Sequence, residues 1–131
     1  FIKAQNAYVK AVRHHHRDFA VKSGFQLGAL FERMYDDMMA AEVPDDLTEE
    51  EIEIYYSELR KHVRPLVTKA IDIYERNVQL GRRLKGGEEW VKKTEAGLAR
   101  LKEVLRSEAE KDAVEALKKV RSRRSTALRS W

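Results

Sequence analysis

The chain has 131 residues, enough for one domain with a modest core. Charged residues make up 37% of it and hydrophobic residues 43%, with only two prolines and six glycines, so an all-α protein with long helices is expected. The absence of cysteine excludes disulfides, thiolate catalysis and cysteine-based zinc sites. No apolar run reaches the roughly 18–20 residues that span a bilayer, so no membrane span is expected.

The N-terminus and the charge distribution set two further expectations. Because the chain starts at Phe1 without a methionine, we expect it to be a piece of a longer protein, and the compartment stays open between cytoplasm and cell envelope. The formal net charge of +4 is uneven, since residues 117–131 hold six Lys or Arg and no acid. The feature to explain is therefore a basic tail rather than a basic domain.

The first third of the chain predicts two helices. Apolar residues at helical spacing predict a short helix over 1–16, and the carboxylate of Asp18 is suited to cap a second helix. The second helix carries one wide apolar face from Phe19 to Ala41. It is expected to end before Pro44, which disfavours helical geometry at the preceding residue.

The sequence "TEEE" opens the next predicted helix. The hydroxyl of Thr48 can accept the amide of Glu51, and the carboxylate of Glu51 can reach back, as in a capping box. Apolar positions then continue at helical spacing as far as Leu80. Pro65 interrupts this pattern and predicts a kinked helix or a break into two.

Two glycines separate this region from the last predicted helix. Gly86 and Gly87 are expected to take left-handed C-cap geometry, and Glu88 and Glu89 suit the following helix N-terminus. Leucines from Leu98 onward continue an apolar stripe along that helix. We therefore expect elongated helices over 1–84, a terminal capping helix over 85–121, and a basic, frayed tail over 122–131.

Part of the pattern resembles the tetratricopeptide repeat. Leu27, Gly28 and Phe31 fit the first helix of such a repeat, with Gly24 at the position of its large residue. In the second helix the repeat uses an alanine and then an aromatic residue four positions on. Ala70 and Tyr74 fit that helix, and Ala4, Tyr8 and Ala11 fit the second helix of a preceding repeat.

The resemblance implies a fold and a function. It implies a helical hairpin array, a solenoid fragment, with about twenty to thirty residues more than the usual repeat between its two matches. The run "PDDLTEEE" and the later "KAIDIYERN", with Trp90, also resemble the terminal part of large tetratricopeptide repeat proteins of deltaproteobacteria. Proteins of this family bind proteins or peptides, so the resemblance implies a non-catalytic scaffold or adaptor whose partner it does not identify.

A histidine cluster and an acidic cluster contain residue types that can bind metal ions. Consecutive residues on a helix point in different directions, so His14, His15 and His16 cannot converge on one metal ion. No Glu-x-x-His pair occurs, which argues against a bundle carboxylate metal centre, and helix capping explains most of the acids around Glu49. We expect no cofactor, no metal and no enzymatic activity.

The basic tail carries the alternative function. Six residues of the tail could bind phosphates of a nucleic acid or another anionic surface. They are Lys118, Lys119, Arg121, Arg123, Arg124 and Arg129. No recognised nucleic-acid module accompanies them, so a solvated basic tail is the favoured interpretation. The sequence also leaves open whether the long helices form a homo-oligomer.

Overall fold

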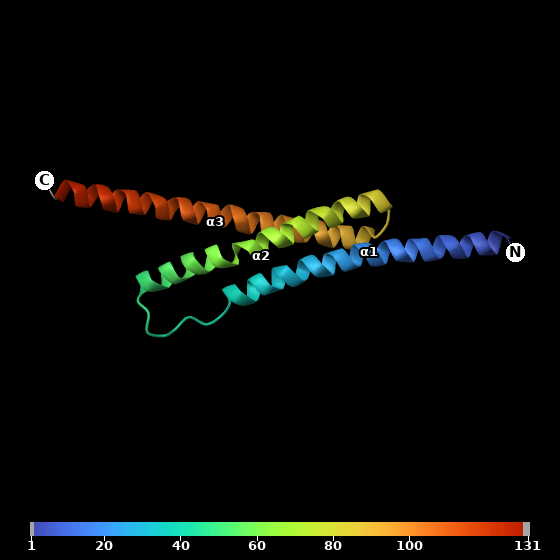
Figure 1. The fold of residues 1–131 in the computed structure, drawn as a ribbon, viewed down its shortest axis with the longest axis horizontal. Helices are drawn as coiled ribbons and strands as arrows, with labels where there is room; N and C mark the ends of the chain where they lie inside the picture. The colour runs from blue at the N-terminus through green and yellow to red at the C-terminus, as the bar shows by residue number, and fades with distance from the viewer. Residues whose placement is uncertain (1, 130–131) are drawn as a thin grey trace.

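The computed structural model describes residues 2–129, and over that range it consists of three long α-helices (Figure 1). They are α1 (Ile2–Met39), α2 (Glu49–Leu84) and α3 (Glu88–Arg129). α1 and α2 form an antiparallel hairpin, and α3 runs in the direction of α1 and packs against both. The expectation of an all-α protein with long helices is confirmed.

α1 is one continuous helix, so the expected break between a helix over 1–16 and a second one is wrong. The sequence has no glycine or proline before Gly24, and its histidines and arginines are compatible with a helix. Asp18 does not cap a helix of its own. Its Oδ1 accepts the amide of Gly87 at 2.6 Å, at the start of α3, where a carboxylate suits the positive end of the helix dipole.

The start of α2 follows the expected capping box. Thr48 is extended, with φ −72° and ψ 166°, and its Oγ1 accepts the amide of Glu51 at 3.2 Å. The same hydroxyl donates to Oε1 of Glu51 at 3.1 Å. The prediction of a capped helix N-terminus at Thr48 is confirmed.

α2 continues through Pro65, so the alternative of two separate helices is wrong. A proline inside a helix removes one backbone hydrogen bond, here the bond to the carbonyl of Lys61. Val63 and Val67 on either side are almost completely buried, whereas Pro65 is exposed. Packing of the flanking turns therefore holds the helix together where local propensity would interrupt it.

In the turn from α2 to α3, one of the two predicted glycines takes the left-handed conformation. Lys85 takes the left-handed conformation, with φ 55° and ψ 44°, and its amide donates to the carbonyl of Gly81. Gly87 also has positive φ, 67°, but Gly86 does not, so its predicted left-handed role is wrong. Gly86 is instead needed for a close approach, since a Cβ there would stand 2.8 Å from Cβ of Arg17.

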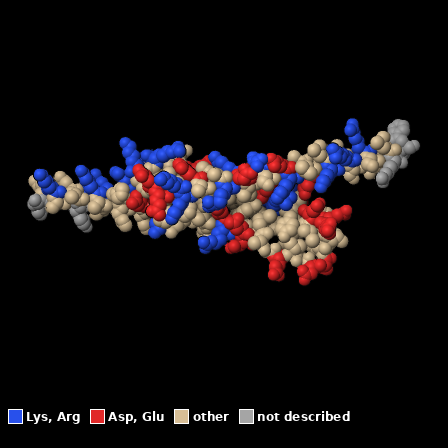
Figure 2. Space-filling view, turned by 180° about the vertical axis from the view of Figure 1, so that it is seen from behind, with Lys and Arg blue, Asp and Glu red and all other residues tan. Residues whose placement is uncertain are grey.

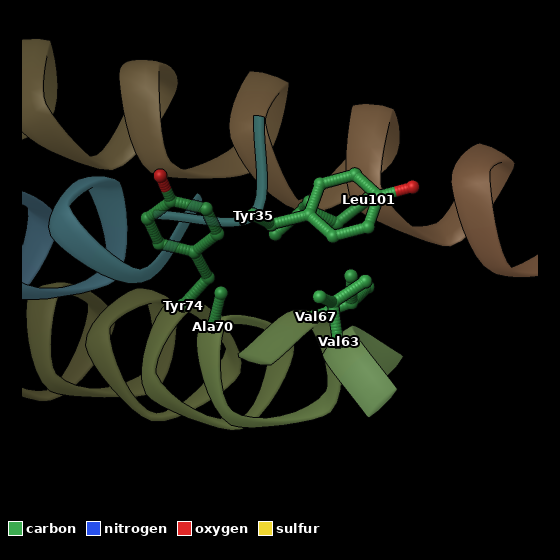
Figure 3. Close-up of a cluster of buried hydrophobic side chains, with 6 residues drawn as sticks. All are labelled: Tyr35, Val63, Val67, Ala70, Tyr74 and Leu101. Carbon is green, nitrogen blue, oxygen red and sulfur yellow. The ribbon is translucent and has the colours of Figure 1, made fainter. Parts of the chain in front are cut away.

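The core lies where all three helices meet (Figure 3). α2 supplies most of it, with one residue each from α1 and α3. Its buried members are Tyr35, Val63, Val67, Ala70, Tyr74 and Leu101. These residues occupy the middle of the molecule, so both α1 and α3 extend beyond the core at opposite ends (Figure 1).

The segment 122–131, expected to be a frayed tail, is helical in the structure as far as Arg129. No glycine or proline follows Gly97 to end the helix, and Oγ1 of Thr126 donates to the carbonyl of Ser122 at 3.0 Å. Side chains over 116–128 are all exposed. The expected boundary at residue 121 therefore falls inside a single helix.

Candidate protein-interaction surface

One face of α1 carries exposed apolar side chains along the whole helix. They recur at intervals of three, four, seven or eight residues, the spacing of one helix face, and each is 40–71% exposed. We call this set the α1 stripe, and it consists of Ile2, Val9, Val12, Phe19, Leu27, Leu30, Met34 and Met38. The remaining positions of the same series are the polar residues Gln5, His16 and Ser23.

The α1 stripe points away from α3. Glu32 of α1 reaches α3, where its Oε1 pairs with Nη2 of Arg100 at 2.9 Å. Leu30 and Met34 are each two residues from Glu32, and residues two apart lie about 200° apart around a helix. The side of α1 that carries the stripe is therefore the side that α3 leaves uncovered.

α2 carries a second apolar row, which also points away from α3. Its α3-facing side is marked by ion pairs of Glu75 with Lys102 at 3.4 Å and of Arg82 with Glu95 at 3.9 Å. Ile73 and Leu80 are two residues from these positions, so they point away from α3. With Leu66 they form a row at seven-residue intervals, partly buried. We call this α2 row and the α1 stripe together the hairpin face, which lies opposite α3.

Two helix ends extend beyond the rest of the molecule. α1 projects beyond the α2–α3 turn, and α3 projects beyond the α1–α2 loop (Figure 1). Apart from the side chain of Tyr8, which lies outside the described part, every residue over 2–16 is exposed, as is every residue over 116–128. An isolated helix of about 12–15 residues is only marginally stable in water. Both ends would gain stability from a partner.

Charge is separated along the hairpin (Figure 2). Lys and Arg line the projecting end of α1, whereas Asp and Glu gather around the α1–α2 loop and the ends of the helices that it joins. Residues 2–22 contain Asp18 as their single acid. Residues 32–58 contain Arg33 as their single Lys or Arg, and their other charged residues are all acids. The hairpin therefore has a basic end and an acidic end.

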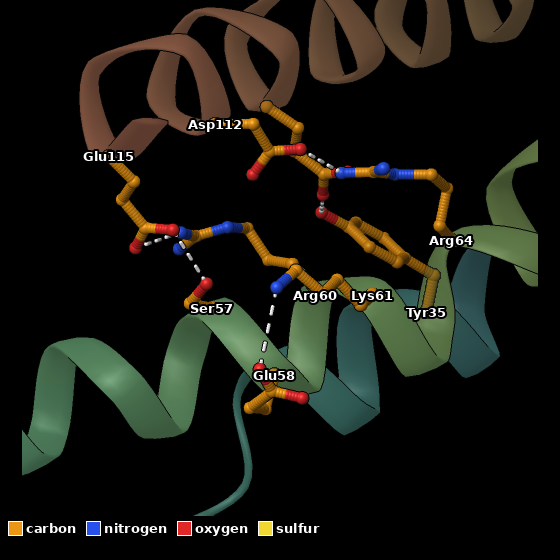
Figure 4. Close-up of polar contacts among 9 residues, drawn as sticks. Tyr35, Ser57, Glu58, Arg60, Lys61, Arg64, Asp112 and Glu115 are labelled. Atoms are coloured by element: carbon orange, nitrogen blue, oxygen red, sulfur yellow. Dashed lines mark hydrogen bonds and ion pairs between the residues drawn. The ribbon is translucent and has the colours of Figure 1, made fainter. Parts of the chain in front are cut away.

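A polar network that the sequence did not reveal joins the three helices (Figure 4). The hydroxyl of Tyr35 donates to Oε1 of the buried Glu108 at 2.8 Å. Arg64 places Nε 3.6 Å from Oε2 of Glu108 and Nη2 2.6 Å from Oδ2 of Asp112. Burial, and next the hydrogen bond to Glu108, raises the pKa of Tyr35, and the hydrogen bond to Asp112 raises the pKa of Arg64. The network joins the helices through charge and hydrogen bonds, although Oε2 of Glu108 and Oδ1 of Asp112 are buried without a hydrogen-bond donor among the described residues.

A second buried polar contact explains Gly24. Nδ2 of Asn77 donates to the carbonyl of Val21 at 2.9 Å and to Oγ1 of Thr94 at 3.0 Å. A Cβ at Gly24 would stand 1.9 Å from Oδ1 of Asn77, so only glycine leaves room for this amide. Nothing in the sequence pattern pairs positions 24 and 77, which lie on different helices.

The residues that match the repeat pattern are partly brought together. Gly28 lies against Tyr74, and Ala70 is fully buried beside it in the core. Phe31 is partly buried against the same core, whereas Leu27 is 49% exposed on the α1 stripe. The remaining positions lie on the projecting end of α1: Ala4 and Ala11 are exposed, and the side chain of Tyr8 lies outside the described part.

The basic residues of α3 do not share one face. Lys118, Lys119, Arg121, Arg123 and Arg124 are all exposed. Because neighbours on a helix are about 100° apart, these five positions point to all sides of α3. The side chain of Arg129 lies outside the described part. A phosphate backbone laid along the helix would meet only some of these cations.

The histidines of α1 lie apart from any metal-binding arrangement. Nε2 of His14 is 3.6 Å from Oδ2 of Asp18, and His15 and His16 are exposed. Among the residues that the structure describes, no group of three His, Asp or Glu side chains is placed to hold a metal ion. Within residues 2–129, no helix has an apolar stretch long enough to cross a bilayer.

Comparisons with protein families, with curated proteins and with solved structures found no match to this chain. The interpretation of the surface therefore depends on its geometry and chemistry.

Proposed function

We propose that the chain is a non-catalytic module for protein–protein interaction and that the hairpin face is its binding surface. The observation that carries this proposal is the α1 stripe, in which eight apolar side chains are exposed along a single helix. At 1.5 Å per residue the stripe is about 55 Å long, and at a width of about 10 Å it offers roughly 550 Å². The largest apolar patch on a typical monomer covers about 300–600 Å² and is often functional, so the α1 stripe, at the upper end of that range, is a suitable binding surface.

We further propose that the hairpin of α1 and α2 is an elongated unit of the tetratricopeptide type, as the sequence resemblance implies. The support for this is the contact between Gly28, which matches the first helix of the repeat, and Tyr74, which matches the second. α1 has 38 residues and α2 has 36, so each is longer than a complete repeat of about 34 residues. The unit would therefore be an elongated form, with its partner surface along the helices.

In-cell photo-crosslinking tests whether protein covers the hairpin face. A photoreactive amino acid would replace Leu30 on the α1 stripe or, as a matched control, Leu117, an exposed leucine on α3. We expect protein adducts from position 30 and few from position 117. Equal yields from both positions, or none from position 30, would contradict an interaction surface on the hairpin face.

A further inference from the structure

We propose that the hairpin face binds the same face of a second copy of this chain, with the two α1 helices antiparallel. This inference rests on the proposed function, because it names the partner of the same surface. Three observations support it: the order of residues along the α1 stripe, the charge separation of the hairpin, and the uncovered end of α1.

The middle of the α1 stripe matches itself when it is reversed. In an antiparallel pair of helices, the numbers of two facing residues have a constant sum, and if the two copies cross at the middle of α1 that sum is about 39. Val12 then faces Leu27 of the partner subunit, and Val9 faces Leu30 of the partner subunit. His16 faces Ser23 of the partner subunit, so a polar pair separates the apolar ones. Four of the eight stripe residues thus meet one another, whereas Met34 faces the polar Gln5 of the partner subunit.

Charge selects the antiparallel arrangement. At this register residues 2–16, which hold three Lys or Arg and no acid, would lie along residues 23–37 of the partner subunit, which hold three acids and Arg33. A parallel arrangement would instead place the two basic ends together and the two acidic ends together. Like charges on facing surfaces disfavour association, whereas complementary ones speed the encounter and fix the orientation.

The area is sufficient for a stable dimer. Residues 2–16 of α1, whose described side chains are all exposed, would lie along the second half of the partner's α1. One helix width over about 55 Å of α1, and a second over the roughly 20 Å of the α2 row, give roughly 750 Å² for each copy. Standard stable interfaces bury about 600–1,000 Å² on each partner, so the hairpin face falls within that range.

Cysteine crosslinking tests the orientation, because the chain has no cysteine of its own. Val12→Cys and Leu27→Cys would be prepared as separate single variants and oxidised alone or mixed. We expect a disulfide-linked dimer mainly in the mixture, since position 12 faces position 27 of the other copy. Leu117→Cys, on α3, serves as the control. Crosslinking of Val12→Cys with itself, at a yield equal to that of the mixture, would show a parallel pair and overturn the proposal.

Light scattering across a concentration series tests the association itself. The purified chain is expected to approach twice its 15.3 kDa mass, and Leu30→Glu to weaken the dimer by at least tenfold while its circular dichroism remains helical. Leu117→Glu is expected to leave the dimer intact, and dissociation by this control instead of Leu30→Glu would overturn the proposal. So would a chain that stays monomeric at about 100 µM. If the chain stays monomeric, in-cell adducts between position 30 and a different protein would still support the proposed function. A lack of such adducts would contradict the proposed function as well as the dimer.

Discussion

Gly28 of α1 lies so close to Tyr74 of α2 that a Cβ at position 28 would stand 2.3 Å from Cε1 of the tyrosine. At the other edge of the ring, a Cβ at Gly97 of α3 would stand 2.7 Å from Cε2. Tyr74 is completely buried, so its ring has no free space to move into. The three helices thus approach one another around one aromatic ring, and a glycine on each side permits the approach.

This contact predicts that Gly28→Ala destabilises the protein. In an ordinary helix interior, replacing glycine with alanine stabilises by about 0.5–1 kcal/mol. Here the added methyl would overlap the ring of Tyr74, and we expect the free energy of unfolding to fall by about 1–3 kcal/mol. Urea denaturation followed by circular dichroism measures the change.

Two further variants serve as controls for this prediction. Ser23→Ala, at an exposed position on the same helix, is expected to change the free energy of unfolding by no more than about 0.5 kcal/mol. Combining Gly28→Ala with Tyr74→Leu should cost less than the sum of the two single changes, because the clash is then relieved. A Gly28→Ala variant as stable as the parent would exclude a packing role for Gly28 and remove the main support for the repeat resemblance.

Tyr74 also predicts a decline of stability in alkali. Burial, and next the neighbouring Glu32 carboxylate, raises the pKa of Tyr74 to about 12, against about 10 in an unfolded chain. As the pH rises past 10, the unfolded state loses the phenol proton first. The stabilising contribution is therefore complete below about pH 10 and is lost as the pH rises through about 12. Unfolding midpoints from about pH 8 upward should fall less steeply in Tyr74→Phe, and equal slopes would contradict this assignment.

The buried carboxylate of Glu108 predicts that Arg64→Met is destabilising. Glu108 is 3% exposed, and the guanidinium of Arg64 is its cationic neighbour. Removing Arg64 leaves this buried carboxylate without its cation, and because the Arg64 side chain is itself 38% exposed we expect a loss of about 1–2 kcal/mol in the free energy of unfolding, less than for a fully buried pair. Arg106→Met is the matched control, since Arg106 pairs with Glu103 and Glu110 on the surface and its replacement should lower the free energy of unfolding far less.

A double variant distinguishes the ion pair from simple packing at position 64. Arg64→Met combined with Glu108→Leu removes both charges, so it should be more stable than Arg64→Met alone. Thermal or chemical unfolding of the four proteins, including the parent, gives the coupling between the two positions. A double variant that is less stable than either single variant would show that the charges themselves are not what matters there.

The uncovered end of α1 predicts concentration-dependent amide exchange. The described side chains over residues 2–16 are all exposed, so this part of the helix should open readily in dilute solution. If a second copy covers them, their exchange should slow as the protein concentration rises. The exposed end of α3, over 118–128, should exchange rapidly throughout and is the internal reference. Equal behaviour of the two ends would contradict coverage of α1.

The basic end of α3 predicts weak, salt-sensitive binding to nucleic acid. Its cations point to all sides of the helix, so few can contact one phosphate backbone at the same time. We expect fluorescence anisotropy with random duplex DNA to show binding only at low salt, and Arg121→Gln with Arg124→Gln to weaken it further. Lys92→Gln with Lys93→Gln is the control. Tight binding that persists near physiological salt would favour the alternative function of an anion-binding module.

Local sequence was sufficient for the features that depend on neighbouring residues. The capping box of Thr48 and Glu51, the loop that contains Pro44 and the positive φ of Gly87 all follow from contacts within a few positions. The same local reasoning failed where a distant segment intervened. Asp18 was predicted to cap its own helix but accepts the amide of Gly87. The alternative of a break at Pro65 was wrong, because buried Val63 and Val67 keep α2 continuous there.

By itself, the sequence determined an all-α chain of long amphipathic helices, because apolar spacing and the scarcity of glycine and proline act locally. It predicted the apolar residues of α1 as a short helix over 1–16 and one wide face from Phe19 to Ala41. Only the tertiary structure decided that Tyr35 lies in the core while Leu27 and Leu30 remain exposed. Helical spacing gives the relative directions of side chains, whereas the positions of α2 and α3 decide which of those directions are covered.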